Sequence, residues 1–219
     1  MGKFSLDTNY IKSVSGDDPK SIIVMCHGFG GSGNDIRVLA ETWKRFLPHT
    51  GFYCPDGPEI CSINPNGFQW FDMDNDKNIT IEKSITAEKI LNNFIDEILD
   101  HHKISKQSLC LVGFSQGCMI ILQAAAKQKN KINCVVGFSG KIIDKDHLEK
   151  NFKSKQKIFL LHGDRDEVVP LSSLLEAKLF FSNMGNKIKT KILRNCEHRI
   201  PVEGASLALK FIKKNIEIK

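Results

Sequence analysis

The segment Gly113–Gly117 reads Gly-Phe-Ser-Gln-Gly and has the residue types of a nucleophilic serine site. A mainly apolar run at 108–112 directly precedes it, and a second apolar run at 118–126 directly follows it. Gly-x-Ser-x-Gly between a strand and a helix is typical of a nucleophile elbow, a turn so tight that its flanks are glycines. The pattern predicts acyl transfer through an ester of Ser115, with the Gln116 amide at the helix start donating to the oxyanion.

A similar sequence, Gly-Phe-Ser-Gly, occurs at 137–140. Lys141 follows it where an elbow requires a second spaced glycine, so this sequence does not predict a tight turn. Ser139 is therefore predicted to be a structural residue at the end of a strand.

A serine nucleophile needs a base that takes its proton and an acid that orients the base. In hydrolases with such an elbow, the acid and then a histidine follow the serine in the chain. A strand-like run at 157–162 leads into Asp164 and Asp166, and another at 188–193 leads into His198. Either aspartate could be the acid or a turn-forming residue. All other histidines precede both aspartates, so His198 is predicted to be the base.

A glycine loop, His27–Gly33, follows the strand-like run at 21–26 and reads His-Gly-Phe-Gly-Gly-Ser-Gly. In esterases, a loop of the His-Gly-x-Gly type supplies the second backbone donor of the oxyanion hole. We assign that donor to the amide of Phe29.

The same loop also fits a dinucleotide fingerprint, Gly-x-Gly-x-x-Gly, at positions 28, 30 and 33. Asp56 lies about 20 residues further on, where that fingerprint has an acidic residue. A nucleotide-dependent oxidoreductase is thus an alternative function, although it leaves the elbow and His198 unexplained. A hydrolase-like binding protein that has lost catalysis is a third alternative.

The elements that must position these residues alternate between strand and helix along the chain. We predict a mostly parallel central sheet with helices on both faces, in a single α/β domain spanning residues 1–219. Strands are expected at 21–26, 51–54, 108–112, 132–137, 157–162 and 188–193, and helices at 35–47, 81–101, 118–126, 171–184 and from 201 onward. The stretch 55–78 is rich in Pro, Asn and Gly and is predicted to be an irregular loop that covers the active site.

Composition limits the other classes of function. The net charge of +6 comes from lysines spread along the 219-residue chain, with no dense basic run interleaved with aromatics, so nucleic-acid binding is not expected. Apolar runs stay far below the roughly 20 residues of a membrane span, so stable membrane insertion is not expected either. Seven scattered cysteines and an N-terminus without an apolar signal segment predict buried reduced thiols in a cytoplasmic protein.

Over nearly its whole length the chain resembles the carboxylesterase, phospholipase and acyl-protein thioesterase family of α/β-hydrolases. The resembling blocks are His27–Gly33, Trp70–Asp72, Gly113–Gly117 and His162–Pro170. The resemblance implies an α/β-hydrolase fold and implies that Asp166 is the acid of a catalytic triad with Ser115 and His198. It also implies that Trp70 and Phe71 line an acyl-binding groove, although these aromatics could equally fill the core beneath the loop. The chain departs from the family pattern around the histidine, where Arg199 either attracts an anionic substrate group or faces solvent.

The expected function is therefore that of a serine hydrolase that cleaves carboxylic esters or thioesters through an acyl-enzyme. Such a reaction requires neither a metal nor an organic cofactor. The substrate is a small or lipid-like acyl ester or thioester, or an acylated protein, and a homodimer is an open alternative. Activity is expected to fall below neutral pH as His198 becomes charged.

Overall fold

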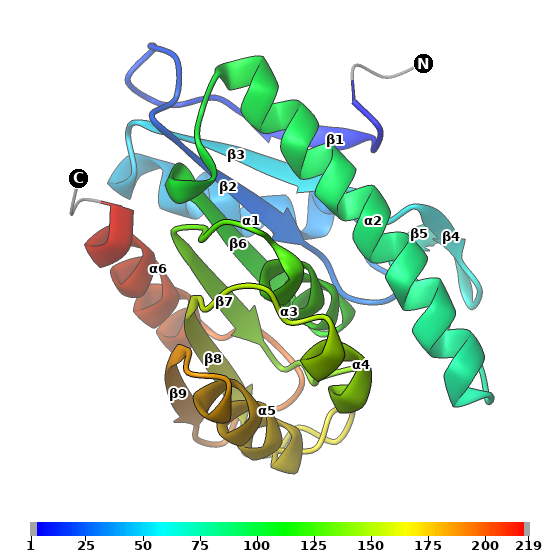
Figure 1. The fold of residues 1–219 in the computed structure, drawn as a ribbon. Coiled ribbons are helices and arrows are strands. Elements are labelled where there is room, and N and C mark those ends of the chain that lie inside the picture. The colour runs from blue at the N-terminus through cyan, green and yellow to red at the C-terminus, as the bar shows by residue number, and fades with distance from the viewer. Residues whose placement is uncertain (1–3, 217–219) are drawn as a thin grey trace.

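The computed structural model describes residues 4–216, in which a twisted seven-stranded sheet forms the central layer (Figure 1). The strand order is β1-β3-β2-β6-β7-β8-β9; β1 pairs antiparallel with β3, and all other neighbours are parallel. The strands are β1 (Thr8–Ile11), β2 (Ser21–Cys26), β3 (Thr50–Pro55), β6 (Leu109–Phe114), β7 (Cys134–Phe138), β8 (Lys157–Gly163) and β9 (Lys187–Leu193).

Helices cover both faces of this sheet, which confirms the predicted α/β-hydrolase architecture. Side chains of α1 and α6 pack in the core on one face, and side chains of α2, α3, α4 and α5 pack in the core on the other. Short 3-10 turns, η1 (Lys44–Phe46) and η2 (Lys106–Ser108), follow α1 and precede β6. The helices are α1 (Gly33–Trp43), α2 (Lys77–His102), α3 (Gln116–Lys127), α4 (Lys145–Lys150), α5 (Ser172–Asn183) and α6 (Val202–Ile216).

The central strands read as continuous apolar runs because both of their faces are buried. In β2, Ile22 and Val24 point into the core formed with α2 and α3, whereas Ile23 and Met25 point into the core formed with α1 and α6. Successive side chains of a strand alternate between the two faces of a sheet. A fully apolar strand can therefore contribute to both cores at once.

The stretch 55–78 is not irregular, so that part of the sequence interpretation was wrong. It holds a separate two-stranded antiparallel sheet, β4 (Glu59–Cys61) and β5 (Asn64–Gln69), and α2 already begins at Lys77. A Cβ at Gly67 would lie 2.1 Å from the carbonyl oxygen of Gly30, so this glycine permits a backbone contact between two distant segments. Polar, glycine-containing strands of this kind carry no alternating apolar pattern that sequence reasoning could detect.

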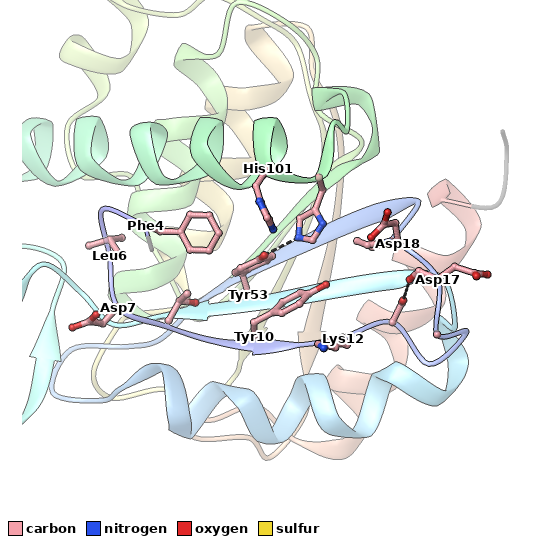
Figure 2. A pocket seen from close by; sticks show the side chains of 14 residues that line it. Phe4, Leu6, Asp7, Tyr10, Lys12, Asp17, Asp18, Tyr53 and His101 are labelled. Carbon is pink, nitrogen blue, oxygen red and sulfur yellow. Dashed lines mark hydrogen bonds between the residues drawn. The ribbon is translucent and has the colours of Figure 1, made fainter. Parts of the chain in front are cut away.

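Strand β1, also missed from the sequence, is attached to the sheet edge by aromatic contacts. The rings of Tyr10 and Tyr53 stack with centroids 4.4 Å apart, and the Tyr53 hydroxyl lies 2.7 Å from Nε2 of His102 at the end of α2 (Figure 2). These side chains line a cavity of about 630 Å³. The cavity lies at the β1 edge of the sheet, whereas Ser115 follows the central strand β6.

All seven cysteines lie within the described residues, and each is buried with a free thiol, as predicted. Burial raises the pKa of Cys118, which lies in the first turn of α3, to about 12. Such a thiol stays protonated near neutral pH and packs as a small apolar side chain. Between residues 4 and 216, no helix is both long enough and apolar enough to cross a membrane.

Candidate active site

The segment 113–117 forms the strand-to-helix turn that its sequence predicts. Ser115 lies between β6 and α3 with φ 53° and ψ −119°, a conformation that non-glycine residues rarely adopt. A Cβ at Gly113 would lie 2.4 Å from the carbonyl oxygen of Gly117, and a Cβ at Gly117 would lie 2.2 Å from that of Cys26. Both glycines are therefore required by close backbone contacts, and the strained turn projects the Ser115 side chain away from the strand.

Three side chains from separate loops meet at this turn. Nε2 of His198 lies 3.0 Å from Oγ of Ser115, and Nδ1 of His198 lies 2.8 Å from Oδ2 of Asp166. Asp166 and His198 follow β8 and β9, which are parallel neighbours, so both loops leave the sheet at the same edge. An ionised carboxylate can only accept, so Nδ1 carries the proton and Nε2 can accept the hydroxyl proton of Ser115.

The carboxylate of Asp166 is held by its own loop. The backbone amides of Val168 and Val169 donate to Oδ1 over 3.0 and 2.8 Å. Burial alone would raise the pKa of Asp166, but the hydrogen bonds from the Val169 amide and from His198 together lower this pKa below its ordinary value. His162, whose role was missed from the sequence, fixes the same loop because its Nε2 lies 2.8 Å from the Val169 carbonyl oxygen.

The other candidate acid, Asp164, points to a different partner. Its Oδ1 accepts a hydrogen bond of 3.2 Å from the amide of Cys196, two residues before His198. The structure therefore brings Asp166 to the imidazole and places Asp164 where it braces the loop that carries His198.

The glycine loop after β2 passes next to the nucleophile. A Cβ at Gly28 would lie 3.1 Å from the ring of Phe114 and 3.2 Å from Cβ of Ser115. The adjacent Phe29 lines a cavity of about 470 Å³ together with Gly28 and His198. On the other side of Ser115, the Gln116 amide is the first of α3, and such amides have no acceptor within their own helix.

The imidazole of His27 fixes this loop, a role that sequence reasoning missed. The Gly57 amide donates to Nε2 of His27 over 2.9 Å, so Nε2 is unprotonated and Nδ1 donates to the Gly28 carbonyl oxygen over 2.7 Å. The indole of Trp70 donates to the carbonyl oxygen of His27 over 3.0 Å. The neutral form of His27 is required for this arrangement, and burial accordingly lowers its pKa.

This lowered pKa predicts a pH-dependent stability. Below pH of about 6.5 the unfolded chain takes up a proton that native His27 does not bind, so the free energy of unfolding should fall as the pH drops. One such group contributes a slope of at most about 1.4 kcal/mol per pH unit. Urea unfolding at pH 7.5, 6.5 and 5.5 measures the slope. In His27→Gln, which keeps an acceptor for the Gly57 amide, the slope should be smaller by up to this amount, and an equal slope in both proteins would contradict the assignment.

Trp70 and Phe71 do not line a groove, contrary to what the family resemblance implied. Their exposed fractions are 0% and 1%, and both pack in the core beneath α2 and α3. Their backbone is held by the side chain of Gln116, whose Oε1 accepts from the Trp70 amide over 2.8 Å and whose Nε2 donates to the Phe71 carbonyl oxygen over 2.6 Å. The alternative of core-filling aromatics is therefore the one that the structure supports.

The stretch 55–78 contacts the glycine loop and does not line the active-site cavity. The Gly30 amide donates to the Phe68 carbonyl oxygen over 2.9 Å, and the Phe68 amide donates to the Gly31 carbonyl oxygen over 2.7 Å. The cavity itself is lined by the 27–31 loop, the start of α1, Phe114 and the 198–200 loop. The two-stranded sheet thus braces the loop that faces Ser115.

The contacts at the start of α1 argue against a dinucleotide site. The carboxylate of Asp56 accepts from the Gly33 amide over 2.7 Å, and that of Asp35 accepts from the Ser32 amide over 2.7 Å. In a dinucleotide-binding fold, the pyrophosphate binds at this helix terminus. Here two carboxylates of the protein already occupy it, and they would repel a phosphate.

Comparisons with known proteins identify the family of this chain. A family model described as phospholipase/carboxylesterase matches residues 9–216. Acyl-protein thioesterase 1 of Kluyveromyces lactis is 29% identical and aligns with 96% of this chain and 99% of its own length. Esterase YpfH of Escherichia coli K12 is 23% identical, over 92% of this chain and 86% of its own. The crystal structure of esterase PE8 is similar with a TM-score of 0.92 and 30% identity, covering 96% of this chain and 99% of that chain.

The family model spans nearly the whole chain, and the relatives align along nearly their full lengths. This chain therefore belongs to the phospholipase/carboxylesterase family of α/β-hydrolases and is a hydrolase of the carboxylesterase and acyl-protein thioesterase type.

Proposed function

We propose that the protein is a serine hydrolase that cleaves carboxylic esters or thioesters through an acyl-enzyme on Ser115. His198 is the general base and Asp166 orients it. The observation that carries the proposal is the pair of linked hydrogen bonds, 3.0 Å from Ser115 to His198 and 2.8 Å from His198 to Asp166. A serine hydroxyl with both partners at these distances is arranged for nucleophilic attack.

The proposed cycle has two halves. Oγ of Ser115 attacks the substrate carbonyl carbon while Nε2 of His198 takes the hydroxyl proton, and the tetrahedral intermediate then releases an alcohol or thiol protonated by His198. Water attacks the acyl-enzyme with His198 again as base, which releases the carboxylic acid and restores Ser115. The amides of Phe29 and Gln116 hold the oxyanion in both halves, and each such donor typically contributes about 3–4 kcal/mol to lowering the barrier.

Labelling by a fluorophosphonate probe tests the nucleophile directly. The probe should form a covalent adduct on Ser115, identified by mass spectrometry of the labelled peptide, because only an activated serine displaces fluoride at a useful rate. A hydrolysis panel of matched oxoesters and thioesters, including lysophospholipids and an S-acylated peptide, would define the substrate class. An adduct on another serine would contradict the proposal.

The pH profile of kcat/KM tests the base. Activity should decrease toward acid pH, because a protonated His198 cannot accept the proton of Ser115. The lowered pKa of Asp166 keeps that carboxylate ionised across the range from pH 5 to 8, so it should not contribute to the decrease. Initial rates with p-nitrophenyl butyrate over this range give the profile. A flat profile would mean that histidine is not the base.

A further inference from the structure

A third hollow lies on the face of the sheet covered by α1 and α6. Its volume is about 740 Å³, and it runs between the two helices. Leu39 and Trp43 line it from α1, and Ala205 and Leu209 line it from α6. The exposed fractions of Val38 and Val202 beside it are 69% and 83%, so apolar surface continues onto its rim. Arg45, Lys210 and Lys213 add charged groups to the lining, but most lining side chains are apolar, so the groove is suited to an apolar chain.

This groove adjoins the cavity at the active site. Asp35, Ile36 and Ile200 line both of them. Phe46 marks the far end of the groove, and the helical path from Ile36 to Phe46 is about 15 Å long. An apolar chain that starts at Ser115 could thus leave the active-site cavity past Ile200 and lie between the helices.

The position of His198 indicates whether the groove would bind the acyl chain or the leaving group of a substrate. An ester carbonyl bound at Ser115 carries two groups, the acyl chain and the leaving alcohol or thiol. The leaving group must contact Nε2 of His198 because it takes its proton from there. The active-site cavity is lined by the 27–31 loop and Phe114, and, where it meets the groove, by His198, Arg199 and Ile200. We therefore infer that this cavity, and the groove next to it, lie on the side of Ser115 from which the leaving group departs.

We propose that the groove between α1 and α6 is a subsite for the leaving group, and that the protein prefers esters or thioesters of long apolar alcohols or thiols. The inference rests on the proposed function and names its substrate class. Each methylene buried in such a groove contributes roughly a four-fold factor to binding. The aliphatic stems of Lys210 and Lys213, which also line the groove, can cover part of the chain.

Two isomeric thioesters distinguish the leaving group from the acyl group. S-decyl thioacetate carries its long chain on the leaving thiol, and S-ethyl decanethioate carries it on the acyl side; released thiol is measured colorimetrically for both. Ala205→Phe fills the groove and should lower kcat/KM for S-decyl thioacetate by about ten-fold or more, and for its isomer by less than two-fold. Ser182→Phe on α5, on the opposite face of the sheet, is the matched control and should change neither value.

The alternatives give different results. A loss confined to S-ethyl decanethioate would mean that the groove takes the acyl chain, and equal losses or no loss would also overturn the proposal. If Ala205→Phe does not fold, Ser206→Phe, an exposed position on the same wall, replaces it.

Fluorescence tests the subsite without turnover. The chain has two tryptophans, and Trp43 lines the groove. The product-like alcohol 10-bromodecan-1-ol should quench the fluorescence of the wild-type protein, and the quenching should disappear in Trp43→Phe and weaken in Ala205→Phe. Absence of quenching would overturn the subsite. Quenching in a protein that hydrolyses neither thioester would instead refute the proposed function and leave the groove as an alkyl-chain site.

Discussion

Replacing Ser115 by alanine should lower kcat for p-nitrophenyl butyrate by roughly 10⁵- to 10⁶-fold, the size of effect typical for loss of an activated serine. The residual rate would come from substrate binding and the oxyanion donors alone. The melting temperature should change little, because alanine keeps the Cβ and therefore the same strain at φ 53°. Stopped-flow and long-time assays of purified protein, with calorimetry on the same samples, measure both quantities.

Ser139 provides a matched control for this variant. It also follows a strand, β7, has φ 48°, and is buried with an exposed fraction of 1%. It lies at the position that the sequence predicted to be structural, and its hydroxyl contributes to lowering the pKa of Asp166. Ser139→Ala should therefore lose far less activity than Ser115→Ala. Full turnover in Ser115→Ala, or equal losses in the two variants, would place the nucleophile elsewhere.

Replacing Asp166 by asparagine should lower kcat by about 10⁴-fold with little loss of stability. The carboxylate can only accept from Nδ1 of His198, whereas an amide can also donate to it and then leaves Nε2 protonated and unable to act as base. Steady-state kinetics should show the loss mainly in kcat, because substrate contacts are unchanged.

Asp164→Asn is the control that separates the two candidate acids. The amide oxygen of asparagine can still accept from the Cys196 amide, so kcat should stay within a few-fold of the wild-type value. The opposite ranking, with Asp164→Asn severely impaired and Asp166→Asn active, would show that the acid has been assigned to the wrong aspartate.

Local chemistry made the main elements of this fold predictable. The strand at 21–26 coincides with β2, because an apolar run bounded by turn residues has few other interpretations. The turn at Ser115 was predictable because its two glycines stand at a fixed spacing between an apolar strand and an apolar helix, although the close contact of Gly117 is with Cys26 of β2. His198 could be predicted as the base because it is the only histidine that follows both candidate aspartates in the chain.

Other features depend on contacts between distant segments and left no local signal. Strands β1, β4 and β5 are short, and their pairing is set by partners far away in the chain. The direction of the Trp70 side chain is set by the hydrogen bond that its indole donates to the His27 carbonyl oxygen, and its backbone is held by the bond that its amide donates to the Gln116 side chain. Whether Asp164 or Asp166 meets His198 depends on the turn of one loop. Residue types alone could not decide it, because both positions hold the same residue.

The side chain of Gln116 has a consequence for engineering this enzyme. Its amide group joins the backbone at Trp70 and Phe71 to the residue that begins α3 directly after Ser115 and that we propose as an oxyanion donor. Loop exchanges or insertions that displace segment 70–71 should consequently alter turnover for every substrate alike, instead of retuning selectivity. Mutant libraries intended to change selectivity are better directed to surfaces that do not touch this glutamine.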